Sequence, residues 1–263
     1  MHTSRGELAV CEAGSGDSLV FLHGFPLDHT MWREQIAEFG SRGRVIAPDL
    51  RGFGKSPPAS PLSVESMADD TAAILGALGV RGPIVLCGLS MGGYVAFQFW
   101  RKYRERVRAL VLCDTRAVAD TPEAAQGRRE QIGRVQSEGV QPVADAMIGK
   151  LFAPRTVDHQ AELVKCVRET MLSADPAGVV AALEALATRP DVRDYLPKIT
   201  CPTLVVVGQH DAISPMAEMR TLATAIPAAE FVVLEDSGHM SPLENPRAFN
   251  AALDGFLNRV RKA

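Results

Sequence analysis

The sequence lacks the patterns that mark several classes of protein. No apolar stretch among its 263 residues is long enough to span a membrane, and the segment Met1–Glu7 lacks the apolar core of a secretion signal. No basic run exceeds Arg101-Lys102, and the net charge is −3, so a nucleic-acid partner is not expected. These absences predict a cytoplasmic protein without a membrane partner.

Cysteine is also scarce, and its pattern excludes two kinds of site. The number of cysteines is odd, they are widely spaced, and no C-x-x-C is present, which argues against both a disulfide framework and a zinc site. The five residues are Cys11, Cys87, Cys113, Cys166 and Cys201. This pattern is typical of a protein from a reducing compartment.

What the sequence does contain is a regular alternation of short apolar runs and longer amphipathic stretches. Continuous β-rich runs predict strands that are covered on both faces, and strand–helix alternation predicts a mostly parallel sheet flanked by helices. The expected strands are 18–22, 44–48, 83–87, 107–113, 203–207 and 230–234. The expected helices between them are 63–78, 91–103, 215–225 and one that begins at Asn245-Pro246.

A block without clear strands interrupts this alternation. Helical stretches are expected near residues 121–137, 141–152, 157–173 and 176–187, separated by Gly and Pro turn signals. The chain therefore divides into an α/β core of residues 1–115 and 198–263 and a helical block of residues 116–197.

Three glycines surround one serine in the stretch from Gly88 to Gly93, GLSMGG. Residues 88–92 fit the G-x-S-x-G pattern between an expected strand and an expected helix, which is the context that this motif requires. A strained turn there lifts the Ser90 hydroxyl above the sheet, and side chains at positions 88 and 92 would collide with neighbouring backbone. The amide of Met91 begins the next helix and can face a developing oxyanion.

A second oxyanion donor is expected from the loop His23-Gly24-Phe25-Pro26, which follows the strand 18–22. Pro26 has no N–H, so the donor is the backbone amide of Phe25. The side chain of His23 is interpreted as structural.

Two loops that follow later strands supply an acid and a base. Asp211 follows the strand 203–207, where open α/β sheets place functional groups, and can orient a histidine. His239 lies in a Gly-flanked loop after the strand 230–234. The chain order Ser90, Asp211, His239 is the order of nucleophile, acid and base that the G-x-S-x-G motif predicts. Asp114 also ends a strand and competes with Asp211 for the acid role, although a helix-capping aspartate explains it equally well.

Together these segments resemble the α/β-hydrolase superfamily over nearly the whole chain. The resemblance rests on DLRGFGKS, GLSMGGYVA, LVVVGQHD and SGHMSPLENP. HGFPLDHTMW and LVLCDTRAVADTPEAAQGR are similar to the branch of 3-oxoadipate enol-lactonases, small-ester carboxylesterases and cofactor-free haloperoxidases or perhydrolases.

The resemblance implies an α/β-hydrolase fold with a helical cap inserted after the sixth strand. It also implies Ser90 as nucleophile, His239 as general acid–base, Asp211 as its orienter, and the Phe25 and Met91 amides as the oxyanion hole. Haloalkane dehalogenases and epoxide hydrolases of this fold carry aspartate where this chain has Ser90, so both activities are excluded.

The expected function is hydrolysis of small carboxylic esters or lactones through an acyl-enzyme, without a metal or organic cofactor. Perhydrolysis at the same residues and a slowly reacting ligand receptor are the alternatives, and the oligomeric state is left open. Pocket candidates are Trp32, Met147 and Phe152. Four arginines of the helical block are candidates for recognising an acidic substrate: Arg116, Arg128, Arg129 and Arg134.

Overall fold

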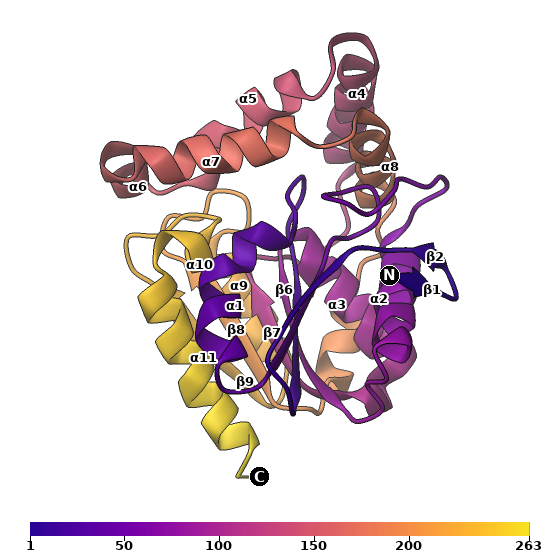
Figure 1. Cartoon of the computed structure of the whole chain (residues 1–263). Coiled ribbons are helices and arrows are strands. Elements are labelled where there is room, and N and C mark those ends of the chain that lie inside the picture. The colour runs from indigo at the N-terminus through magenta and orange to yellow at the C-terminus, as the bar shows by residue number, and fades with distance from the viewer. Residues whose placement is uncertain (263) are drawn as a thin grey trace.

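The computed structural model describes residues 1–262, in which a central sheet carries helices on both faces and a helical layer at one end (Figure 1). In this sheet the strand Val10–Ala13 is antiparallel to the strand Arg44–Pro48, and all other neighbouring strands are parallel. The seven strands, in spatial order, are β3 (Val10–Ala13), β5 (Arg44–Pro48), β4 (Ser18–Leu22), β6 (Ile84–Leu89), β7 (Val107–Cys113), β8 (Thr203–Gly208) and β9 (Ala229–Leu234).

The six strands predicted from continuous apolar runs are all present. Three of them, β4, β6 and β8, are buried along their whole length, as such runs predict. Strand β3 was not expected, because its residues are at most partly buried and carry no apolar run. A separate two-stranded sheet of β1 (His2–Thr3) and β2 (Gly6–Glu7), which pair only with each other, was not expected either.

Two layers of helices cover the sheet. On one face lie α2 (Val64–Ala77), α3 (Met91–Tyr103) and α9 (Met216–Ala225). On the other face lie α1 (Arg33–Gly40) and α11 (Pro246–Val260). Shorter helical segments are η1 (His29–Trp32), η2 (Arg104–Arg106), η3 (Arg193–Lys198) and α10 (Ser241–Glu244). Of these elements, α1, α10 and the three short segments η1, η2 and η3 were not expected from the sequence.

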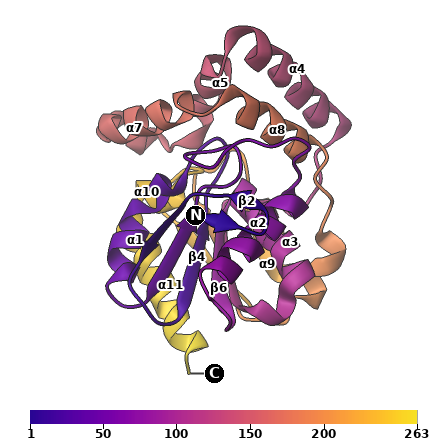
Figure 2. The ribbon, with the colours of Figure 1, turned by 45° about the vertical axis from the view of Figure 1, so that its right-hand side comes forward.

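The helical block lies over the carboxyl ends of the strands, as the two views of the ribbon show (Figures 1 and 2). Its helices, here called the cap, are α4 (Pro122–Glu138), α5 (Gln141–Leu151), α6 (Pro154–His159), α7 (Ala161–Leu172) and α8 (Pro176–Ala187). The cap follows β7, which is the fifth strand of the large sheet in chain order. A helical insert between strands is confirmed, but its expected place after a sixth strand differs by one, because only four strands of this sheet precede β7.

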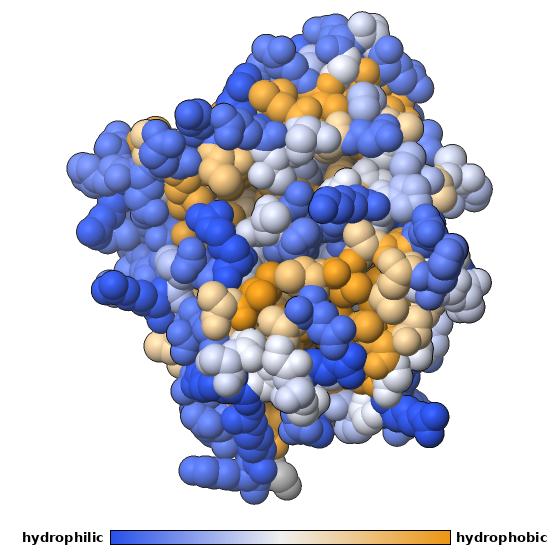
Figure 3. Space-filling view, viewed as in Figure 1, coloured by the Kyte–Doolittle hydropathy of each residue, from blue (hydrophilic) through white to orange (hydrophobic). Residues whose placement is uncertain are grey.

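The surface of the molecule is mixed in character. Hydrophilic residues cover most of the outer edge of the face in Figure 3, and apolar residues gather in patches over both the cap and the core. Within residues 1–262 no single helix has the length and apolar composition to cross a membrane; α7 and α8 pass that test only as a pair, and they meet at a bend of 94°. All five cysteines are free thiols.

Candidate active site

Ser90 occupies the sharp turn between β6 and α3 with a backbone conformation of φ 52° and ψ −111°. Residues with a side chain rarely adopt a positive φ, so the turn is strained at the serine. A Cβ atom at position 88 would lie 2.3 Å from the Gly92 carbonyl oxygen, and one at position 92 would lie 2.2 Å from the carbonyl oxygen of Leu22. The close approach that requires glycine on both sides of Ser90 is thus present.

Asp211 and His239 meet at the same end of the sheet. The Asp211 carboxylate (Oδ2) accepts a hydrogen bond from His239 Nδ1 at 2.9 Å, and both side chains are buried. The other oxygen, Oδ1, accepts the N–H groups of Ile213 and Ser214 at 2.8 and 2.9 Å. The acid is therefore held by the backbone that follows it, and the imidazole is held by the acid.

The charge of Asp211 determines which nitrogen of His239 is free. Burial by itself would raise the pKa of Asp211, but the charge and hydrogen bond of His239, with the two backbone N–H groups, outweigh it and lower that pKa. Asp211 is consequently ionised at neutral pH, and its bond selects the tautomer with the proton on Nδ1. Nε2 of His239 remains as the basic nitrogen.

The loop after β4 lies directly against Ser90. A Cβ atom at Gly24 would be 3.6 Å from Ser90 Cβ, so the next residue, Phe25, is beside the serine. His23 anchors this loop: its buried ring accepts the Leu50 N–H at Nε2 (2.8 Å) and donates from Nδ1 to the Gly24 carbonyl (2.9 Å). The side chain of His23 therefore has the structural role that the sequence favoured.

Met91 is the first residue of α3, so its N–H has no acceptor within the helix. Of the two expected oxyanion donors, Met91 directly follows Ser90 in the chain, and Phe25 follows Gly24, whose backbone lies against Ser90. No hydrogen bond joins the Ser90 hydroxyl to His239 among residues 1–262. The structure brings the acid and the base together and places the serine at the same edge of the sheet.

The three pocket candidates differ in position. Trp32 is fully buried, and its ring centroid lies 4.8 Å from that of Phe21 and 6.0 Å from that of Phe249. Trp32 therefore belongs to the core. Met147 is half-buried on the cap and contacts apolar clusters from both faces of the molecule. Phe152 is buried at the end of α5, where its backbone lies against the loop of His239.

The four cap arginines have polar partners within the chain. The partners are Glu218 for Arg116, Asp120 for Arg128, Gln126 for Arg129 and Glu138 for Arg134. For Arg116, Arg128 and Arg134 the partner is a carboxylate, which compensates the charge and makes each a poor receptor for a second carboxylate.

One group of side chains has the composition of a cation site. Ligand atoms of Asp28, His29 and Asp49 lie within 4.8 Å of one another. They bond to the protein itself, however: Asp49 accepts from the His29 ring at 2.6 Å and from the N–H of Lys55 at 2.9 Å, and Asp28 accepts from Thr30. The cluster fastens loops together and needs no ion to satisfy it.

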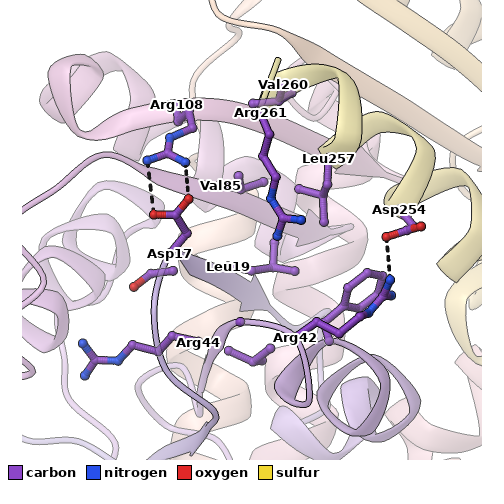
Figure 4. A pocket seen from close by; sticks show the side chains of 14 residues that line it. Asp17, Leu19, Arg42, Arg44, Val85, Arg108, Asp254, Leu257, Val260 and Arg261 are labelled. Atoms are coloured by element: carbon purple, nitrogen blue, oxygen red, sulfur yellow. Dashed lines mark hydrogen bonds and ion pairs between the residues drawn. The ribbon is translucent and has the colours of Figure 1, made fainter. Parts of the chain in front are cut away.

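A separate small pocket lies at the amino ends of β4 to β7, opposite the carboxyl ends that carry Ser90 and Asp211 (Figure 4). Its rim carries ion pairs between Arg108 and Asp17 (2.6 Å) and between Arg42 and Asp254 (2.7 Å). It therefore lies apart from the candidate active site.

Comparison with known proteins places this geometry in context. A family model described as alpha/beta hydrolase fold matches residues 17–246. The structure of a thermophilic esterase from Thermogutta terrifontis with malate bound superposes with a TM-score of 0.96 and 47% identity, over 98% of this chain and 97% of that one. The 3-oxoadipate enol-lactonase 2 of Acinetobacter baylyi is 30% identical over 92% of this chain and 89% of its own length.

A third relative carries a different activity in its name. BpoC of Mycobacterium tuberculosis, named as a candidate non-heme bromoperoxidase, is 28% identical over 97% of this chain and 98% of that protein. The relatives thus include an esterase, an enol-lactonase and a haloperoxidase-type protein, the three kinds to which the sequence was similar.

Proposed function

The chain belongs to the alpha/beta hydrolase fold family, and on that premise we propose that it is a serine hydrolase of small carboxylic esters or lactones. The observation that carries the proposal is the hydrogen bond between buried Asp211 and His239 at the sheet edge where a strained turn presents Ser90. The similarity to an esterase at 47% identity supports the same class of substrate.

In the proposed reaction the Ser90 hydroxyl attacks the substrate carbonyl while His239 Nε2 takes its proton. The Phe25 and Met91 N–H groups bind the oxyanion, and each such donor is typically worth about 3–4 kcal/mol of barrier. His239 then protonates the leaving alkoxide, and water hydrolyses the acyl-enzyme. The proposal requires Ser90 Oγ and His239 Nε2 to reach hydrogen-bond distance in the substrate complex, where catalytic hydrogen bonds commonly tighten.

The surroundings favour a neutral substrate. Arg116 and Arg128 are bonded to carboxylates of the protein, so neither is available to a dicarboxylate lactone. In the proposal, residues 116–197 act as a cap over Ser90, with Met147 and Phe152 as its contribution to the pocket. We therefore favour short neutral esters over acidic lactones.

Perhydrolysis is the alternative reaction at the same residues. The relationship to BpoC favours considering it, because peroxide can replace water as the nucleophile that attacks an acyl-enzyme. A peracid or peroxide-dependent halogenation assay beside the ester assay separates the two reactions.

Substitution of the proposed nucleophile tests the mechanism. Ser90→Ala removes the attacking oxygen, so kcat with p-nitrophenyl acetate should fall by roughly 10⁴-fold or more. A chain-length series of p-nitrophenyl esters and one lactone, assayed with both proteins, also defines the preferred acyl group. Ser41→Ala, at an exposed serine after α1, is the control and should retain full activity. Turnover by a folded Ser90→Ala variant at the wild-type rate would remove Ser90 from the mechanism.

A further inference from the structure

The end of β7 contacts the backbone of Ser90 on both sides. The Ser90 N–H donates to the Cys113 carbonyl at 3.0 Å, and the Thr115 hydroxyl donates to the Ser90 carbonyl at 2.8 Å. Both polar backbone groups of the strained residue are therefore bound by residues 113 and 115. Asp114 lies between these two, is fully buried, and itself has a positive φ of 45°.

The side chain of Asp114 reaches the other two arms of the site. Its Oδ1 accepts the N–H of Gly208 at 2.8 Å, and its Oδ2 bonds to the hydroxyl of Ser241 at 2.5 Å. Gly208 ends β8 just before the turn to Asp211, and Ser241 begins α10 just after His239. One carboxyl group thus joins the acid segment to the histidine segment.

The same contacts show why Asp114 is not the acid that orients the imidazole. Both of its oxygens have partners other than His239, and His239 Nδ1 bonds to Asp211 instead. The competition between the two aspartates, which the sequence left open, is resolved by these hydrogen bonds.

We propose that Asp114 is a positioning residue that sets the place of His239 relative to Ser90. This inference rests on the proposed function of Ser90 and His239. Residues 113 and 115 bind the backbone of Ser90. Asp114, which lies between them, connects them to the segment before Asp211 and to the segment after His239. Asp114 acts through these segments and does not touch the reacting atoms.

The position requires hydrogen bonds and no negative charge. Burial, reinforced by the nearby charge of Asp211, raises the pKa of Asp114 well above its usual range. An asparagine keeps both contacts, because its carbonyl accepts from Gly208 and its amide donates to Ser241. An alanine removes both contacts and leaves two buried groups unpaired.

Three variants assayed with p-nitrophenyl acetate test this role. Asp114→Ala should lower kcat by about 10- to 100-fold with little change in KM, because a misplacement of the order of 1 Å costs that much. Asp114→Asn should restore kcat to within about threefold of wild type. Ser241→Ala removes only one of the two contacts, so its kcat should lie between those of Asp114→Ala and Asp114→Asn. Far-UV circular dichroism checks the fold of each variant.

The outcomes separate this inference from the function on which it depends. Wild-type kcat in a folded Asp114→Ala variant overturns the inference. So does an Asp114→Asn variant that loses as much kcat as Ser241→Ala or more, since a charge would then be needed. If Asp114→Ala does not fold, Asp114→Asn and Ser241→Ala decide alone: wild-type kcat in Ser241→Ala overturns the inference. Retention of activity in Ser90→Ala overturns the proposed function instead.

Discussion

His29 fastens the loop that carries Phe25, the proposed oxyanion donor, to the loop after β5. Its ring Nδ1 lies 2.6 Å from Asp49 Oδ1, and its backbone N–H donates to the same oxygen at 2.9 Å. The hydrogen bond with Asp49 raises the pKa of His29 despite the opposing effect of burial. The protonated imidazolium is therefore the form that stabilises this junction.

This junction predicts a pH-dependent contribution to stability. The folded pKa of His29 exceeds the unfolded value of about 6.5, so its contribution is fully present below that pH and is lost as pH rises through the folded pKa. His29→Ala should therefore lower the free energy of unfolding more at pH 5.5 than at pH 9. Urea unfolding of both proteins at the two pH values measures this, and an equal loss at both would contradict the prediction.

At the scale of elements, α10 connects the cap to the loop of His239 through one buried side chain. Glu244 Oε2 accepts from the Ala153 N–H (2.8 Å) and the Thr156 hydroxyl (2.7 Å), both on the cap. Oε1 accepts from the Gly238 N–H at 2.8 Å, next to His239. Three donors therefore converge on a carboxylate that is almost completely buried.

Glu244→Gln should loosen this connection. A glutamine has one acceptor oxygen, so at least one buried donor loses its partner, at a cost of about 1–3 kcal/mol in unfolding free energy. Urea unfolding measures the loss. Glu169→Gln, on the exposed side of α7, is the matched control and should change stability by less than about 0.5 kcal/mol. Equal effects of the two substitutions would show that Glu244 makes no special contribution.

At the scale of the whole molecule, the cap docks on the core at a second place, where α8 meets the loop after β5. A Cβ atom at Gly178 would lie 1.9 Å from the carbonyl oxygen of Gly52, which itself has φ 87°. Beyond the other end of α8, buried Arg189 bonds to Asp120 before α4, so the two connections of the cap are joined. The cap is thus fastened to the core at two places, through Glu244 at α6 and through Gly52 at α8.

A pair of glycine substitutions in the cap measures this docking. Gly178→Ala should lower the free energy of unfolding by about 1–3 kcal/mol, because the added methyl group collides with backbone and separates α8 from the core. Gly133→Ala, inside α4 where the methyl group meets nothing within 4 Å, should raise it by roughly 0.5–1 kcal/mol. Thermal unfolding of both variants gives the comparison. A stabilising Gly178→Ala would contradict the close contact.

The sequence by itself determined six of the seven strands of the large sheet, most of the helices and the turn at Ser90, because these follow from patterns between near neighbours. Continuous apolar runs predicted β4 and β8 with bounds that differ by at most one residue from the observed ones. The glycines around Ser90 indicated that backbone segments approach each other closely at this turn. The predicted helix 157–173 is divided into α6 and α7 at Gln160, where no Gly or Pro marks the break.

Only the tertiary structure decided which distant side chains meet. Asp114 and Asp211 both follow strands, and their contacts differ because Gly208 and Ser241 bond to Asp114, whereas His239 bonds to Asp211. Trp32 is a large aromatic residue of the kind that lines pockets, but Phe249 from the last helix packs against it and makes it part of the core. Glu244 carries no local signal, since two of its three donors come from the cap, about 90 residues earlier in the chain. Contacts across such separations depend on how elements pack, which no short stretch of sequence encodes.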